Sequence, residues 1–310
     1  VAAEAFLLDG DRRDRPFFLS VGFTETHRDG GGAAHCYDDD MDPEAADGRY
    51  CLPPAPIPDT PVTRKDMANL KIGAKRLDDK VGRVLAALDR SGQADRTFVI
   101  ITTDHGIAWP HAKGNLTDMG LGVMLMMRGP LDGGKGQAFR GGRVVDELVS
   151  HMDVYPTLCD IIGLDKPDWL QGHSLVPMMS GEVEAVRDHI FGEQSYHCHW
   201  LDPQRSIRTP RYKYIRRMDV PHMRIVDPGP TNDWMRELNY PDQPDEVELL
   251  YDLYFDPVEL HNLVDDTRYA SVLEDLRSKL DDWMDQTQDP FQTGAIPQPP
   301  AVLTRQAQQV

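Results

Sequence analysis

The chain has 310 residues, of which 40% are hydrophobic and 27% charged, an ordinary globular composition that allows a sizeable buried core. Its formal net charge of -18 repels nucleic acid and anionic membranes, so neither is an expected partner. No stretch approaches the roughly 18 consecutive apolar residues of a membrane-spanning helix.

The first residues and the cysteines do not identify the cellular compartment of the protein. The opening residues VAAEAFLL contain no methionine and no basic region, so they are not a signal peptide and are typical of the last turns of a helix. We therefore expect the sequence to begin inside a longer protein. The four cysteines are widely spaced without a C-x-x-C pair, which argues against a thiolate zinc site and leaves the compartment open.

The first 188 residues combine apolar runs with amphipathic segments. Three apolar runs are typical of buried strands: residues 16–23, 97–103 and 123–127. Two segments predict helices: residues 63–91, capped by Thr63, and residues 154–162, capped by Asp153. This order predicts an α/β domain over residues 1–188, built on a mostly parallel sheet flanked by helices.

The pattern changes after residue 188. Three short segments resemble strands: residues 206–208, 212–215 and 249–252. An amphipathic helix is predicted over residues 269–286, and the chain becomes rich in Pro and Gln from residue 289. We expect a small antiparallel sheet plus a helix over residues 189–288, and a tail over residues 289–310.

Polar residues follow the predicted strands at the edge where α/β sheets bind ligands. The second strand ends in Asp104-His105-Gly106, which suits half of a divalent-metal site, although the Asp could instead cap the next helix. Lys113 lies in the glycine-containing loop that follows, where it could neutralise an anionic oxygen or remain solvated. The first strand leads to His27, which could act as a general acid or be a structural histidine.

Several segments in series resemble the sulfatase family of the alkaline phosphatase superfamily. They are PFFLSVGFTETHR, VIITTDHG, HMDVYPTLCDIIGL, IRTPRYKYI and LYDLYFDPVELHNL, and the resemblance covers roughly residues 15–290. The sequence looks most similar to the heparan N-sulfatase-like (sulfamidase) branch. Four segments carry that similarity: residues 26–28, 113–116, 191–208 and 289–290. The fold that this implies is alkaline phosphatase-like.

The resemblance implies a metal site. Asp104 and His105 match the family's metal-ligand pair, and Ca²⁺ is the usual ion. His105 stands where many sulfatases have Asn, so Mn²⁺ or Zn²⁺ is an alternative. A second histidine pair, His197 and His199 around Cys198, is not expected to bind metal, since nothing else converges on it.

The resemblance also implies a substrate site. Lys113 matches the lysine that binds the sulfuryl oxygens, and His27 matches the histidine near the leaving-group oxygen. His197 and Arg205 are expected to face the substrate, which would be a sulfated sugar or a small sulfate ester.

The nucleophile is the main departure from the family pattern. The family uses a formylglycine made from Cys or Ser in C/S-x-P-x-R. The comparable stretch here, CLPPA from Cys51, has Ala in place of Arg, and it follows the strand before His27, whereas the family's site precedes it. We therefore expect the nucleophile to lie outside this sequence and the chain alone to be inactive.

These observations favour a sulfatase that hydrolyses sulfuric esters or sulfamates. Two alternatives remain open at this stage. A phosphodiester or phosphonate hydrolase of the same superfamily is compatible with the Asp104-His105 pair, and a non-catalytic fragment or binding module is compatible with the missing nucleophile.

Overall fold

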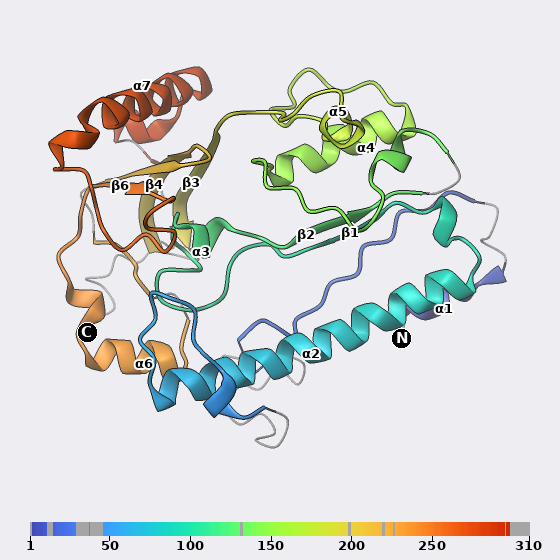
Figure 1. Ribbon diagram of the computed structural model, residues 1–310, viewed down its shortest axis with the longest axis horizontal. Coiled ribbons are helices and arrows are strands. Elements are labelled where there is room, and N and C mark those ends of the chain that lie inside the picture. The colour runs from blue at the N-terminus through green and yellow to red at the C-terminus, as the bar shows by residue number, and fades with distance from the viewer. Residues whose placement is uncertain are drawn as a thin grey trace. The chain divides into compact units, whose positions relative to one another are not determined.

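The computed structural model describes residues 2–10, 15–28, 37, 46–130, 133–197, 200–218, 221–225, 227–294 and 296–297. The chain forms two compact units (Figure 1). The first comprises Val1–Asp47, Ala68–Thr103 and Met124–Arg187; the second comprises Gly48–Met67, Asp104–Val123 and Asp188–Val310. The second unit therefore includes two segments from the part of the chain that the sequence assigned to the α/β domain.

The long helix α2 (Pro61–Arg90) agrees with the amphipathic pattern but begins earlier than expected. Thr60 is its capping residue, because the Thr60 hydroxyl accepts from Thr63 N at 3.2 Å and the Thr63 hydroxyl accepts from Thr60 N at 3.0 Å. Pro61 fits the first helical position, where no backbone N–H is needed. Thr63 thus closes a reciprocal cap rather than starting the helix.

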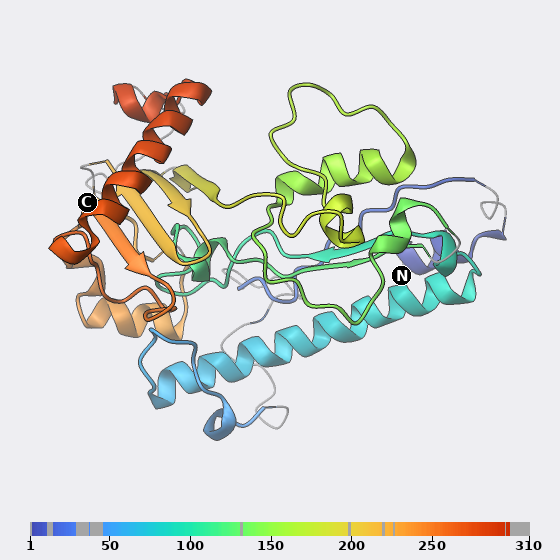
Figure 2. The same cartoon turned by 45° about the horizontal axis from the view of Figure 1, so that its top comes forward.

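The first unit contains the strands β1 (Val99–Thr102) and β2 (Leu125–Arg128), which run side by side in Figure 2. They pair antiparallel, with Val99 opposite Arg128 and Thr102 opposite Leu125, whereas the sequence pattern indicated parallel strands. Residues 16–23 form no strand, although their apolar pattern predicted one. An apolar run fixes burial but not the direction or partner of a strand.

Helices complete the first unit. The short helix α1 (Ala2–Leu8) packs Leu7 against Leu88 of α2. The helix α4 (Val154–Ile162) has the predicted bounds, and α5 (Val176–Ser180) lies beside it. Asp153 precedes α4 but does not cap it through its side chain; its carboxylate instead pairs with Arg187 and accepts from the backbone N–H groups of residues 150 and 173.

The second unit is built on the predicted antiparallel sheet, with strands in the order β3-β4-β5-β6. The strands are β3 (Ile190–His197), β4 (Trp200–Arg208), β5 (Tyr212–Arg217) and β6 (Glu248–Asp252). The helix α7 (Ala270–Thr287) covers one face of this sheet (Figure 1). Its buried residues Leu273, Leu276, Leu280 and Met284 recur at helical spacing and pack on Ile207, Tyr214 and Leu250. Each fully buried leucine contributes roughly 2 kcal/mol of transfer free energy.

Two further helices and a final turn belong to the second unit. The helix α3 (Asp118–Leu121) follows the Lys113 loop, and α6 (Pro230–Glu237) lies between β5 and β6 in the chain. Residues 289–293 were expected to be a tail, but Phe291 is buried in the core under α7, in the 3-10 turn Pro290–Thr293. Among the described residues, no helix has the length and apolar character needed to cross a membrane.

Candidate active site

A tight glycine turn presents the candidate metal ligands. Asp104, His105 and Gly106 begin two residues after the end of β1, and Gly106 N donates to Gly120 O at 2.9 Å. A Cβ atom at Gly106 would lie 1.7 Å from the carbonyl oxygen of Met119, which is far inside any allowed contact. Only glycine therefore permits this turn to lie against the start of α3.

The turn leaves one nitrogen of His105 available as a ligand. His105 Nδ1 lies 2.7 Å from Gly106 O, and because a carbonyl can only accept, this contact places the proton on Nδ1. The unprotonated Nε2 of the neutral ring then lies 3.6 Å from Asp104 Oδ2. A backbone carbonyl that fixes the ring of a metal-binding histidine is a common supporting contact.

These two side chains fit a divalent cation as an incomplete set of ligands. The Asp104 side chain is 87% exposed, so a cation can reach its carboxylate, whose Oδ1 accepts from His105 N at 3.0 Å. No group of three His, Cys, Asp or Glu residues with metal-binding geometry occurs in the described residues. Oxygen donors would suit Ca²⁺, whereas the imidazole also suits Mn²⁺ or Zn²⁺.

Lys113 lies in the same unit, in a loop closed by backbone hydrogen bonds. Its N–H donates to Ile107 O at 3.0 Å, and Trp109 of the same loop is buried beside Ile57 and Ala112. Lys113 is only 8% exposed, and its Nζ lies 3.0 Å from Asp227 Oδ2. A nearly buried ammonium group needs an anion beside it, and here a carboxylate meets that need. The sequence reasoning missed Asp227, which no motif marks.

His197, at the end of β3, shares the electrostatic environment of this loop. Burial lowers the pKa of His197, and the positive charges of Lys113 and His105 lower that pKa further. Asp227 opposes this shift by attraction. The ring of His197 is therefore close enough to Lys113, Asp227 and His105 to feel their charges, and its substrate role stays a prediction. His199 and Cys198 lie outside the described residues.

Arg205 also lies in the second unit, but its guanidinium group is engaged by the protein. It is 2% exposed, and its Nε and Nη2 both donate to the carboxylate of Asp289. Nη1 donates to the carbonyl oxygens of Gln194 and Gln204, each at 2.7 Å, and Nη2 reaches the Ser195 hydroxyl at 3.2 Å. These contacts describe a structural ion pair, and a substrate role for Arg205 stays a prediction.

His27 belongs to the first unit. Its Nδ1 lies 2.7 Å from the carbonyl oxygen of Arg28, which leaves Nε2 for another partner. Its role near a leaving group stays a prediction. Cys51, which the sequence pattern excluded as nucleophile, is buried.

The architecture and this site define the class of protein. The chain superposes on a solved structure described as a 2-O GAG sulfatase with a TM-score of 0.59 at 22% identity, over 93% of this chain and 57% of that one. It also superposes on the phosphonate monoester hydrolase of Agrobacterium radiobacter with a TM-score of 0.53 at 28% identity, over 73% and 42% of the two chains. The fold is the mixed α/β fold of the sulfatases.

The sequence comparisons identify the family. The protein-family model described as Sulfatase matches residues 2–164. The family model described as N-sulphoglucosamine sulphohydrolase, C-terminal, matches residues 121–228. The chain therefore belongs to the sulfatase family. It is 30% identical over 320 residues to the human N-sulphoglucosamine sulphohydrolase, covering 90% of this chain and 62% of that protein. The chain spans about half the length of the curated relatives that it matches.

Proposed function

We propose that this chain is the part of a sulfuric ester or sulfamate hydrolase that binds the sulfuryl oxygens and supplies two metal ligands. The observation that carries this proposal is the nearly buried ammonium group of Lys113, held by Asp227 in the same unit as the Asp104-His105 turn. An ammonium group that little water reaches forms strong charge-assisted hydrogen bonds with an anion, and a sulfuryl oxygen would compete with Asp227 for it.

The residues of the chain would act by charge and by proton transfer. The ammonium group of Lys113 balances the negative charge on a sulfuryl oxygen, and it does so strongly because little water reaches it. His27 protonates the departing oxygen or nitrogen, and His197 contacts the substrate with a neutral ring. A divalent cation held by Asp104 and His105 would supply Lewis-acid stabilisation of the same oxygens. The nucleophile that the family uses, a formylglycine, has no C/S-x-P-x-R motif in this sequence.

The substrate class follows from the relatives. The name of the human relative specifies N-sulphoglucosamine, and one structural neighbour is described as a 2-O GAG sulfatase. Both descriptions concern sulfated sugars. We infer that a sulfated sugar, rather than a simple sulfate ester, is the substrate of the protein to which this chain belongs.

The test compares Lys113→Ala with Lys75→Ala in a preparation that includes the formylglycine segment. Lys75 is the matched control because its side chain is 74% exposed and pairs with Asp79 of the same helix. We expect Lys113→Ala to lower kcat/KM on an aryl sulfate by at least about 100-fold, as loss of an oxyanion-stabilising group does. Lys75→Ala should leave it unchanged. Equal effects of the two substitutions would contradict the role of Lys113.

A second candidate, phosphonate hydrolysis, is supported by the similarity to the phosphonate monoester hydrolase structure. Both reactions bind a tetrahedral oxyanion through a cation and a lysine, so the site geometry alone accommodates either. Assays of an aryl sulfate and an aryl phosphonate side by side separate them. Turnover of the phosphonate alone would replace the sulfatase proposal, and turnover of neither would favour a binding module.

A further inference from the structure

The loop that carries Lys113 is held at two points, two residues before and two residues after the lysine. His111 contacts Tyr240, and Asn115 contacts His222. Both partners come from residues 222–240, the segment that also contributes Asp227 to the lysine itself. One stretch of chain thus contacts the loop on both sides of the ammonium group and at that group.

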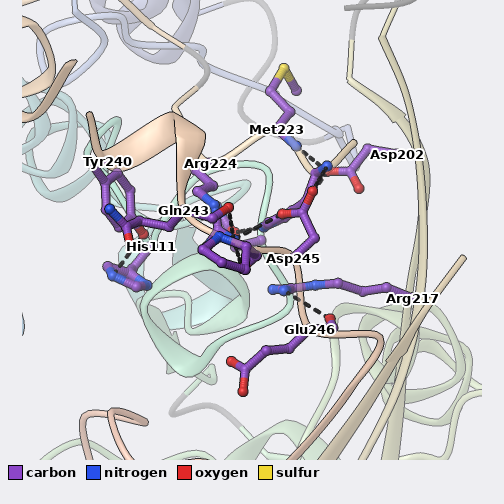
Figure 3. A network of polar contacts seen from close by, with 12 residues as sticks. His111, Asp202, Arg217, Met223, Arg224, Tyr240, Gln243, Asp245 and Glu246 are labelled. Atoms are coloured by element: carbon purple, nitrogen blue, oxygen red, sulfur yellow. Dashed lines mark hydrogen bonds and ion pairs between the residues drawn. The ribbon is translucent and has the colours of Figure 1, made fainter. Parts of the chain in front are cut away.

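The contact at His111 is a short hydrogen bond between two largely buried rings. The Tyr240 hydroxyl lies 2.7 Å from His111 Nε2, and the ring centroids are 5.1 Å apart (Figure 3). His111 has a φ of 63°, which is rare for a residue with a side chain and needs outside support. Burial and the positive charge of Arg224 lower the pKa of His111 to about 4, so the ring is neutral near neutral pH.

Tyr240 is itself fixed by its neighbours. The guanidinium carbon of Arg224 lies 5.7 Å from the Tyr240 ring centroid, a cation–π contact. Arg224 Nη2 donates to Asp245 Oδ1 at 2.8 Å and to the carbonyl oxygen of Pro244 at 2.7 Å. Figure 3 shows these groups gathered beside the Tyr240–His111 pair. Arg224 thus links the Tyr240 ring to Pro244 and Asp245.

The contact at Asn115 is the last in a buried series of side-chain contacts that begins at Asp202 in the sheet. Asp202 Oδ2, on β4, lies 2.9 Å from His222 Nδ1, and His222 Nε2 lies 2.8 Å from Asn115 Oδ1. Asp202 is held in turn by Gln204 Nε2 at 3.0 Å and by the backbone N–H of Met223 at 3.2 Å. All of these residues are buried, so water does not compete for their hydrogen bonds.

We propose that Tyr240 and His222 are paired positioning residues, which fix the backbone between His111 and Asn115 and so hold the Lys113 ammonium group at one point. This inference rests on the proposed anion-binding function of Lys113 and adds the device that locates it. Catalytic groups lose much of their effect when they shift by about 1 Å, so a lysine on a loop needs such supports on both sides.

The test measures the acetylation rate of individual lysines by mass spectrometry in the intact chain. The variants are Tyr240→Phe and His222→Gln, and the matched controls are Tyr254→Phe and His261→Gln, whose parent side chains are 76% and 79% exposed. We call the His111–Tyr240 and Asn115–His222 contacts the clamp. We expect each of the two clamp variants, Tyr240→Phe and His222→Gln, to raise the acetylation rate of Lys113 by roughly tenfold, the effect of losing one buried hydrogen bond. The controls should leave it unchanged.

Lys213 is the internal reference, because it is completely buried and pairs with Asp118 and Glu259, neither of which takes part in the His111–Tyr240 or the Asn115–His222 contact. A rate that rises at Lys113 but not at Lys213 supports positioning. Rates that rise together show general loosening of the fold and overturn the proposal, as does a Lys113 rate that does not change.

The same assay separates this proposal from the function on which it rests. Added inorganic sulfate should slow Lys113 acetylation in the wild-type chain if the lysine binds sulfuryl oxygens. If sulfate does not slow acetylation of Lys113, but Tyr240→Phe and His222→Gln still raise its rate selectively, the anion-binding function is contradicted and the positioning proposal is supported. Should sulfate protect Lys113 in the wild-type chain while neither Tyr240→Phe nor His222→Gln raises the Lys113 acetylation rate selectively, the positioning proposal fails and the anion-binding function stands.

Discussion

Replacing Asp289 with Asn should destabilise the second unit strongly, because the guanidinium group of Arg205 would remain buried without its counter-charge. The two side chains are 2% and 3% exposed, and two nitrogen atoms of Arg205 donate to the carboxylate. Removing one partner of such a pair costs about 3–5 kcal/mol. The amide of Asn can still accept from Phe291 N, which Asp289 does at 2.9 Å, so the local turn is preserved and the charge is the main loss.

Thermal unfolding followed by calorimetry measures the effect. A loss of about 3 kcal/mol corresponds to a fall in Tm of roughly 6–12 °C for a unit of this size. Glu193→Gln is the control, since its carboxylate lies 3.8 Å from Arg205 Nε but is 66% exposed, and such a pair is worth at most about 1 kcal/mol. An unchanged Tm for Asp289→Asn, combined with lost protection of Lys113 by sulfate, would show that Arg205 serves the substrate and refute the structural assignment.

The same ion pair predicts a dependence on pH. Burial acts to raise the pKa of Asp289, but the hydrogen bonds from Arg205 and from Phe291 N outweigh it and lower that pKa below its ordinary value. The carboxylate therefore stabilises the folded state above the pKa of the unfolded chain, about 4, and this contribution is lost as pH falls through the folded pKa. The difference in Tm between wild type and Asp289→Asn should be constant above about pH 5 and should narrow in acid.

Three further outcomes can be checked. Gly106→Ala should destabilise the chain by at least about 2 kcal/mol in urea unfolding, because its Cβ would meet Met119 O at 1.7 Å; an unchanged midpoint would contradict the tight turn. Since the folded pKa of His111 is about 4, below that of the unfolded ring, stability should fall by up to about 3 kcal/mol from pH 6.5 to 4, and His111→Gln should flatten this slope. Asp227→Asn should improve protection of Lys113 by sulfate about threefold or more, because no carboxylate competes; weaker protection would contradict this.

The candidate site was only partly accessible to sequence reasoning. The Asp104-His105-Gly106 turn and Lys113 could be proposed because each follows a strand or lies in a glycine-containing loop. Asp227 and Tyr240 could not, because they approach Lys113 and His111 from more than 100 positions away in the chain. Neither lies in a spacing pattern that local rules recognise.

What the sequence determined by itself are the features that depend on neighbouring residues. The periodicity of α2, α4 and α7, the end of β4, the strands β5 and β6 and the turn after β1 follow from side chains a few positions apart, whereas the sequence did not predict β3. Tertiary structure alone decided the antiparallel pairing of β1 with β2, the burial of Phe291 in place of a tail, and the engagement of Arg205 by Asp289. These features depend on contacts between residues that are distant in the chain. The free energy of burying a charge or an apolar ring is set by those contacts and not by the residues next to it in the sequence.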